Sequence, residues 1–142
     1  MRSSKSVFLP LIVMLASVFS AVARDADSIA GEWVSVDPHT RGITRVMIAQ
    51  DEAGWAVQAF GRCHPRDCDW RSVPVVPLGE AVEDNSFRQG FAVWKPGFAT
   101  KYVTFTLREE RLVADIVTVF HDCSGRANFR RTEVLKRRDQ GR

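Results

Sequence analysis

Apolar and polar residues alternate over short runs along most of the chain, and a period of two is the pattern of β-strands with one buried face. Residues 100–107 show it clearly, with Tyr102 and Thr104 opposite Val103 and Phe105. No segment of useful length repeats apolar residues with the 3.6-residue period of a helix. The pattern predicts eight strands, at residues 31–36, 43–50, 55–62, 70–78, 87–95, 100–107, 112–120 and 127–136.

The spacing of these strands predicts the fold class. Short strands that follow one another about every dozen residues are typical of an all-β sandwich or barrel. The connections are of hairpin length, so each strand should pair with its neighbours in sequence, and we expect an eight-stranded antiparallel up-and-down barrel. The alternative is a β-sandwich, which needs at least one long crossing connection that the sequence does not contain.

The N-terminal residues have the pattern of an export signal. Arg2 and Lys5 precede an apolar run over residues 7–19, and residues 21–23 have the small-x-small form that signal peptidase accepts. The apolar run is shorter than the roughly 20 residues that span a bilayer. We therefore expect a signal peptide over residues 1–23, export to the periplasm or out of the cell, and no membrane span after its removal.

The length and charge of the remaining chain set further limits. The full sequence has 142 residues, of which 20 are basic and 17 acidic. We expect one domain over residues 24–136 and a basic flexible tail over 137–142. The basic residues of the mature chain lie mostly near this tail, and no nucleic-acid-binding motif accompanies them. A monomer that binds neither nucleic acid nor a cofactor is the expectation.

Three cysteines in an exported chain indicate one disulfide and one remaining thiol. Cys63 and Cys68 are the expected pair, because only four residues separate them and Pro65 favours a turn between them. Cys123 would then keep its thiol. Closing so short a loop contributes about 2 kcal/mol in the chain-entropy model, so its main effect would be to fix the loop itself.

The segment that contains this pair, here called the disulfide loop (residues 62–71), is unusually rich in special side chains. A simple connector needs only polar residues and one or two turn formers. Arginine and aromatic side chains supply much of the energy at protein interfaces. The candidate binding residues in it are His64, Arg66, Asp67 and Trp70.

Two resemblances bear on the fold. The Gly31-x-Trp33 pattern in the first strand, with Lys136 and Arg137 at the end of the last strand, resembles the calycin pattern of lipocalins and avidins. This resemblance implies structural roles for these four residues. In such barrels, a basic side chain from the closing strand lies over the tryptophan at the closed end.

The second resemblance rests on three short sequence motifs. They are Thr-Arg-Gly-Ile-Thr-Arg at 40–45, Cys-His-Pro-Arg-Asp-Cys-Asp-Trp at 63–70 and Asp-x-Ser-Gly-Arg at 122–126. Together they resemble a group of small exported bacterial β-domains with a CHPxDCDW motif. The group has no established activity, so the resemblance implies a compartment and a fold but no catalytic residue. Arg71 stands where that group usually has glycine.

The expected topology brings several reactive side chains to one end. In eight consecutive antiparallel strands, the first, third, fifth and seventh connections emerge at the same end, here called the rim. All three histidines and all three cysteines lie in these connections. His39 and His121 therefore join His64 as candidate binding residues.

A zinc site is one alternative use of the rim. Cys63, Cys68, His121 and Cys123 are of the sulfur and nitrogen ligand types that zinc prefers. Against it, the spacing of Cys63 and Cys68 is not that of a recognised zinc finger, and an oxidising compartment would consume their thiols.

Catalysis is a further alternative, because Cys123 lies close in sequence to His121 and Asp122. The turn at Ser124 and Gly125 makes a shared face for His121 and Cys123 unfavourable. No serine-hydrolase elbow or phosphate-binding loop is present. We expect no enzymatic activity.

The sequence thus predicts an exported binding module that engages a protein partner in the cell envelope, as an inhibitor would, through the disulfide loop. The alternatives are a carrier of a small hydrophobic ligand inside the barrel and a zinc-binding protein. Large side chains are expected to fill the interior, which favours the rim over an internal cavity. They are Trp55, Phe60, Phe91, Trp94, Phe105, Phe120 and Phe129.

Overall fold

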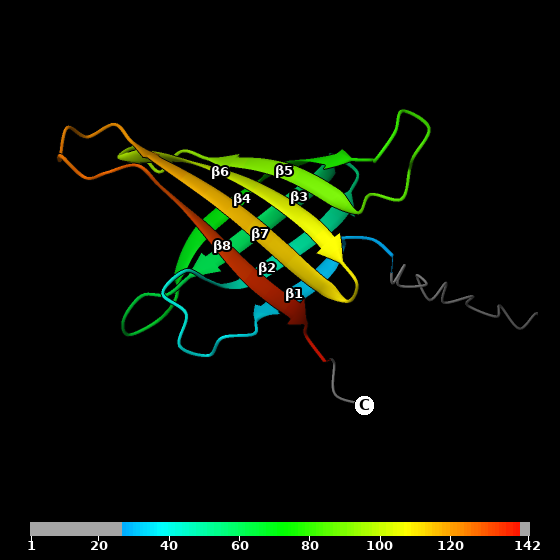
Figure 1. Cartoon of the computed structure of the whole chain (residues 1–142), viewed down its shortest axis with the longest axis horizontal. Coiled ribbons are helices and arrows are strands. Elements are labelled where there is room, and N and C mark those ends of the chain that lie inside the picture. The colour runs from blue at the N-terminus through cyan, green and yellow to red at the C-terminus, as the bar shows by residue number, and fades with distance from the viewer. Residues whose placement is uncertain (1–26, 140–142) are drawn as a thin grey trace, which may run out of the picture.

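The computed structural model describes residues 27–139, whose strands form one closed antiparallel barrel (Figure 1). Each strand pairs with its neighbours in sequence, and the last pairs with the first. The all-β up-and-down barrel is confirmed, and the sandwich alternative is wrong. The strands are β1 (Gly31–Ser35), β2 (Ile43–Asp51), β3 (Gly54–Gly61), β4 (Cys68–Leu78), β5 (Gln89–Trp94), β6 (Ala99–Arg108), β7 (Arg111–Phe120) and β8 (Phe129–Arg137).

The expected signal peptide, residues 1–23, and residues 140–142 of the expected tail lie outside the described residues. β8 includes Arg137, one residue past the expected domain boundary at 136. Arg138 continues the contact with β1, because its backbone N–H donates to the Glu32 carbonyl at 2.9 Å. No helix within residues 27–139 has the length and apolarity needed to cross a membrane.

The core lies inside the barrel, and along β3, β5, β6 and β7 buried residues alternate with more exposed ones. Trp33, Val57, Val103 and Phe105 are fully buried there. Three of the large residues expected inside do not fill the interior: Phe129 is 44 % exposed, and Phe60 and Phe91 lie on the outer face of the barrel.

The register of the alternation in β3 and β5 explains why Phe60 and Phe91 lie outside the barrel. Ala59 and Ala92 are the buried positions of β3 and β5, so their neighbours Phe60 and Phe91 point outward. Phe60 is covered there by the guanidinium of Arg45, whose central carbon lies 4.0 Å from the ring centroid. Two small residues thus occupy space in the interior that the sequence prediction gave to aromatic rings.

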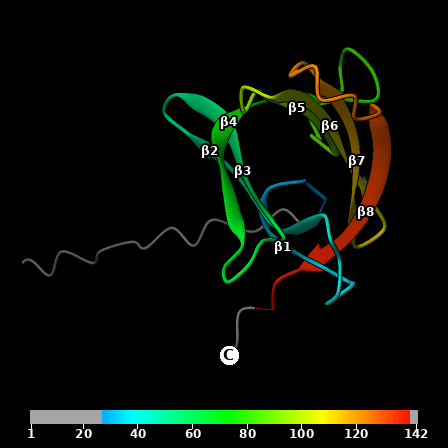
Figure 2. The ribbon, with the colours of Figure 1, turned by 90° about the vertical axis from the view of Figure 1, so that its left-hand side faces the viewer.

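The connections β1–β2, β3–β4, β5–β6 and β7–β8 all emerge at one end of the barrel, at the left of Figure 1. The predicted rim is therefore confirmed. Figure 2 looks onto it, with the 36–42 and 62–67 connections on the lower side and the 95–98 and 121–128 connections on the upper side.

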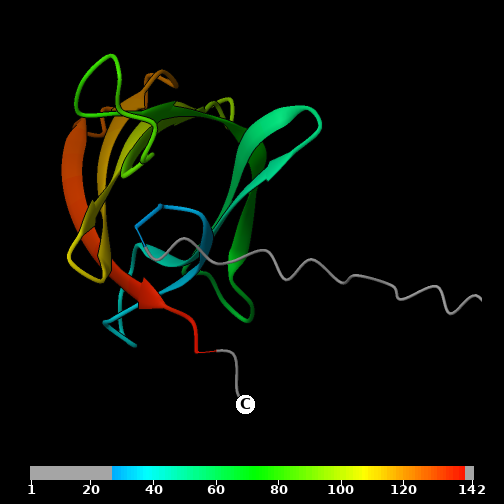
Figure 3. The same cartoon turned by 90° about the vertical axis from the view of Figure 1, so that its right-hand side faces the viewer.

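Residues 27–30 close the opposite end by curling across the barrel (Figure 3). Ile29 is fully buried there, and its N–H donates to the Phe87 carbonyl at 3.1 Å. The indole N–H of Trp33 donates to the Ile29 carbonyl at 2.9 Å. Burying a side chain of this size contributes about 1.5–3 kcal/mol, which holds the segment in place.

Arg137 fastens this segment to the end of β8. Its guanidinium lies over the Trp33 ring, 4.2 Å from the centroid. It also donates to the carbonyls of Ala30 at 2.8 Å and Ser28 at 2.7 Å. The basic contact to the tryptophan that the calycin resemblance implied is present, and Arg137 makes it, whereas Lys136 is exposed.

We predict that Arg137→Met lowers the free energy of unfolding by about 2–3 kcal/mol, because two hydrogen bonds from a charged donor to backbone carbonyls are lost. Lys136→Met is the matched control: it removes the same charge from an exposed neighbour and should change stability by less than about 0.5 kcal/mol. Urea unfolding of both variants measures this. Equal effects of the two substitutions would contradict a specific role for Arg137.

Candidate functional site

A cavity of about 630 Å³, here called the mouth cavity, lies at the rim. Its size is within the range of roughly 300–1,000 Å³ typical of small-molecule sites. Its lining comes from the 36–42, 62–67 and 95–98 connections and from the rim ends of β3 to β6. The lining residues are Arg41, Gly42, Gly61, Arg62, Cys63, Cys68, Asp69, Trp70, Arg71, Val73, Trp94, Lys95, Pro96, Phe98 and Lys101.

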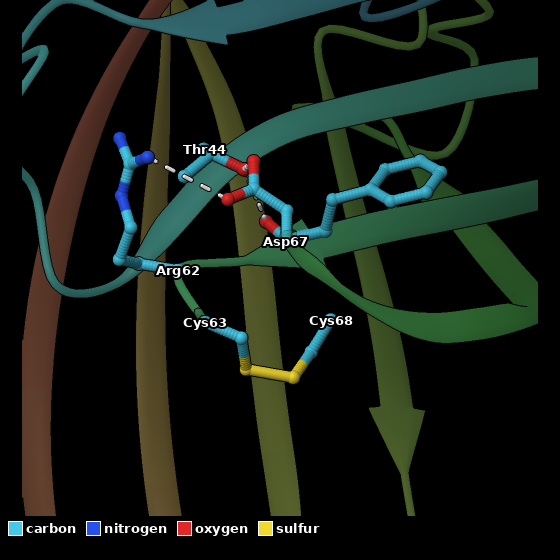
Figure 4. The surroundings of a disulfide bond; sticks show 6 residues. Thr44, Arg62, Cys63, Asp67 and Cys68 are labelled. Carbon is cyan, nitrogen blue, oxygen red and sulfur yellow. Dashed lines mark hydrogen bonds and ion pairs between the residues drawn. A yellow bond between two sulfur atoms is a disulfide. The ribbon is translucent and has the colours of Figure 1, made fainter. Parts of the chain in front are cut away.

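The disulfide loop forms one wall of the mouth cavity. Cys63 and Cys68 are bonded to each other, as predicted, and their Cα atoms lie 5.5 Å apart. Asp67, between them, accepts a hydrogen bond from the Thr44 hydroxyl at 2.6 Å and pairs with Arg62 at 3.6 Å (Figure 4). The loop is therefore held both by a covalent bond and by polar contacts to β2.

Arg62 extends these contacts to the 36–42 connection. Its side chain donates to the carbonyls of Pro38 at 3.0 Å and Thr40 at 3.3 Å. Its backbone N–H donates to the Gly42 carbonyl at 2.9 Å. Two neighbouring rim connections are thereby joined into one surface, which reduces the conformational freedom that a bound ligand would have to restrict.

Aromatic rings form the inner wall of the mouth cavity. The rings of Trp70 and Trp94 meet edge to face with centroids 5.8 Å apart, and Trp94 meets Phe105 in the same way at 6.5 Å. Trp70 packs directly against Gly61, where a Cβ would lie 2.7 Å from the indole nitrogen. The row of rings therefore runs from the barrel core to the cavity.

A distortion of β4 orients this wall. The pairing of β3 with β4 shifts register between Gln58 and Phe60, and Arg71 has a φ of 70°. The Arg71 carbonyl accepts the indole N–H of Trp94 at 2.9 Å. Glycine adopts such a φ without steric cost, whereas the Cβ of Arg71 makes this conformation strained.

The charged part of the lining is mostly basic. Asp69 is its single carboxylate, and it accepts hydrogen bonds from Gln58 at 3.0 Å and from the Arg71 N–H at 2.7 Å. These hydrogen bonds lower the pKa of Asp69, and the bond from Gln58 has the larger effect. Its charge is therefore already engaged by groups of its own strand pair.

A buried carboxylate lies next to the cavity. Glu133 of β8 is 8 % exposed, accepts a hydrogen bond from the Thr40 hydroxyl at 2.9 Å and pairs with Arg131 at 3.7 Å. Gly42 lies directly against it, and a Cβ at that position would overlap the carboxylate. The glycine allows the 36–42 connection to approach β8 closely.

The connection between β7 and β8 has its own network. Asp122 accepts from the Ser124 N–H at 3.2 Å and pairs with Arg126. The Arg126 guanidinium lies over the Phe120 ring, 4.1 Å from its centroid. The pKa of Asp122 is lowered to about 2. The hydrogen bond with Ser124 has the largest effect, and the hydrogen bond with Arg126 lowers the pKa further.

The predicted binding residues share the rim but do not form one cluster. His39, His64 and Arg66 are exposed and do not line the mouth cavity. Asp67 supports the loop from within, and Trp70 alone among these candidates lines the cavity. His121 belongs to the other side of the rim, with its Nε2 2.9 Å from the Thr100 hydroxyl.

The alternative zinc ligand set is wrong, because two of its four thiol or imidazole groups, Cys63 and Cys68, are joined in the disulfide. Cys123 is an exposed free cysteine. Over residues 27–139, no three His, Cys, Asp or Glu side chains are grouped so that they would hold a metal ion.

The sequence prediction missed the charged residues that face inward. Lys101 lies on the same face of β6 as Val103 and Phe105, and Arg131 lies on the same face of β8 as Glu133 and Leu135. Extending the alternation of each strand to its rim end would have placed both side chains toward the interior.

Comparison of the chain with protein-family models, with curated proteins and with solved structures found no match in any of the three.

We predict that Arg71→Gly is more stable than Arg71→Ala by about 0.5–1 kcal/mol, because only the alanine variant keeps a Cβ in the left-handed conformation. Both variants lack the guanidinium, so the comparison isolates the backbone. Urea unfolding measures the difference. An alanine variant as stable as the glycine variant would show that the conformation at this position relaxes.

Asp122 should make stability depend on acid pH. Its pKa is lowered from 3.8 to about 2 in the folded protein, so its contribution is complete above about pH 4 and is lost as the pH falls toward 2. Asp122→Asn should therefore be less stable than the wild type at pH 6 and lose this deficit near pH 2. Thermal unfolding at several pH values checks this, and a deficit that stays constant with pH would exclude the ionised carboxylate as its source.

Proposed function

We propose that this protein is an exported binding protein that takes a small molecule into the mouth cavity. The observation that carries the proposal is the cavity itself: about 630 Å³ of space lined by Trp70, Trp94 and Phe98 at the one end of the barrel that residues 27–30 do not close. Concave sites with aromatic walls and a few polar groups are the usual form of small-molecule sites. Among the functions weighed from the sequence, the ligand carrier is thus favoured over the protein binder.

The stiffness of the walls supports this function. The disulfide fixes one loop, and Arg62 joins it to the neighbouring connection. Walls that are ordered before binding cost less entropy when the ligand arrives. The disulfide also fits the expected export to the periplasm or the medium, where such bonds persist.

A second candidate, a protein partner, is favoured by the apolar side chains exposed around the same rim. Val36 is 45 % exposed, and Phe98 and Phe129 are each 44 % exposed. An envelope protein that seats on the rim would cover them together with Arg66. In this case the purified protein should retain one envelope protein in a stoichiometric amount.

The first test uses N-phenyl-1-naphthylamine, a neutral aromatic probe whose fluorescence rises when it leaves water. The wild type should bind it saturably, one molecule per chain. Val73→Phe, which fills the mouth cavity, should bind it about ten-fold more weakly or worse, a loss of roughly 1.4 kcal/mol or more. The matched control is Val76→Phe on the same strand, where the side chain is 55 % exposed and outside the cavity.

Overpacking at residue 73 costs about 1–3 kcal/mol of stability, so folding of each variant is checked by near-ultraviolet circular dichroism. Val73→Ala enlarges the cavity without overpacking and should keep the probe. A wild type that shows no saturable binding, or two phenylalanine variants with equal affinity, would refute the cavity as the binding site.

A further inference from the structure

A lysine points into the mouth of the barrel. On β6, Ala99, Val103 and Phe105 are buried, so the alternation directs Lys101 to the same inner face. Its ammonium lies over the Trp70 ring, 4.4 Å from the centroid, and the residue lines the mouth cavity. An inward lysine at the rim end of an otherwise apolar strand face needs a chemical reason.

No carboxylate of the described chain neutralises this ammonium. The ion pairs within residues 27–139 are made by arginines, and none includes Lys101. Burial lowers the pKa of Lys101, and the like charge of Arg131 lowers it further. Both causes disfavour a cation at this place, and an anion bound beside it would offset both.

The one buried acid among residues 27–139 already has its own partners. Glu133 pairs with Arg131 at 3.7 Å and accepts the hydroxyl of Thr40 at 2.9 Å. It therefore balances one of the two inward cations, and Lys101 remains the unbalanced one. Removing ions from water is costly unless a partner is supplied.

A neutral hydroxyl lies beside the lysine with its hydrogen-bonding capacity unused. Thr118 pairs directly with Lys101 across β6 and β7, so their side chains leave the sheet on the same face about 5 Å apart. Thr118 is 1 % exposed, and its Oγ1 has no hydrogen-bond partner within the described residues. Buried hydroxyls are normally paired, so this one is a ready donor.

The other charged residues that line the mouth cavity are also mostly basic. Five basic side chains line the cavity, and the one acid, Asp69, is engaged by Gln58 and the Arg71 backbone. A concave surface with an excess of one charge attracts ligands of the opposite charge and raises their rate of association. The basic lining residues are Arg41, Arg62, Arg71, Lys95 and Lys101.

We propose that the mouth cavity selects organic acids, namely ligands in which a carboxylate or sulfonate is joined to a flat apolar body. Lys101 binds the acidic group, and Trp70, Trp94 and Phe98 contact the apolar body. This inference rests on the proposed function and narrows it from small molecules in general to anionic ones.

The test compares two probes that share one aromatic body. 1-Anilinonaphthalene-8-sulfonate carries a sulfonate, and N-phenyl-1-naphthylamine is neutral. The wild type should bind the sulfonate more tightly, and the preference should shrink as salt is added. Lys101→Met should weaken binding of the sulfonate by about ten-fold or more, the effect expected for one charge-assisted contact, and leave binding of the neutral probe within about two-fold.

Two control variants complete the test. Lys136→Met removes the same charge from an exposed position outside the mouth cavity and should leave both affinities unchanged. Lys101→Arg keeps the charge and should retain most of the preference. If Lys101→Met does not fold, the salt dependence of the wild type and the Lys101→Arg result still decide the matter.

The outcomes separate the two proposals. Equal wild-type affinity for both probes, or a sulfonate preference that survives in Lys101→Met, would overturn the selection of acids while the cavity remains a binding site. Binding of neither probe would remove the proposed function as well. A preference lost equally in Lys136→Met would show that it reflects net charge and not this site.

Discussion

The contact of Arg137 with Trp33 and with the carbonyls of residues 28 and 30 is the interaction on which the arrangement of this molecule depends. The pairing of β1 with β8 is short, with three residue pairs, and Trp33 opposite Arg137 is one of them. The guanidinium adds a ring contact and two charge-assisted hydrogen bonds at this seam. The antiparallel order places the odd-numbered connections at one end, and the seam closes the barrel so that they surround a common opening. Residues 27–30 cover the other end, so within the described chain the rim is the open side of the barrel.

The rim in turn contains two kinds of side chain that work against each other in the absence of a ligand. The row formed by Trp70, Trp94 and Phe105 extends the apolar core outward, whereas Lys101 and Arg131 bring positive charge onto the same inner surface. A core built only for stability would place an apolar residue at 101. The proposed organic acid satisfies both kinds of side chain at once, which is why the charge and the rings are best explained together.

The sequence was sufficient for the fold because most strands have a period of two and no connection is long enough for a crossing between sheets. It was also sufficient for the disulfide, since the spacing of Cys63 and Cys68 allowed little else. It did not predict the mouth cavity, because Phe60 and Phe91 were assigned to the interior, and small alanines occupy those inner positions instead. The polar pair of Lys101 and Thr118 depends on register between two strands, which no single strand encodes.

The closed end also determines how the molecule can be attached to something else. The described chain enters beside β1 and leaves after β8 at the end opposite the rim (Figures 1 and 3). An affinity tag, a fluorescent fusion or a chip surface joined directly to residue 27 or residue 139 would therefore be attached behind the barrel. Protein immobilised in this way would present its opening to the solution, so surface-based binding assays would sample the unobstructed site at either point of attachment.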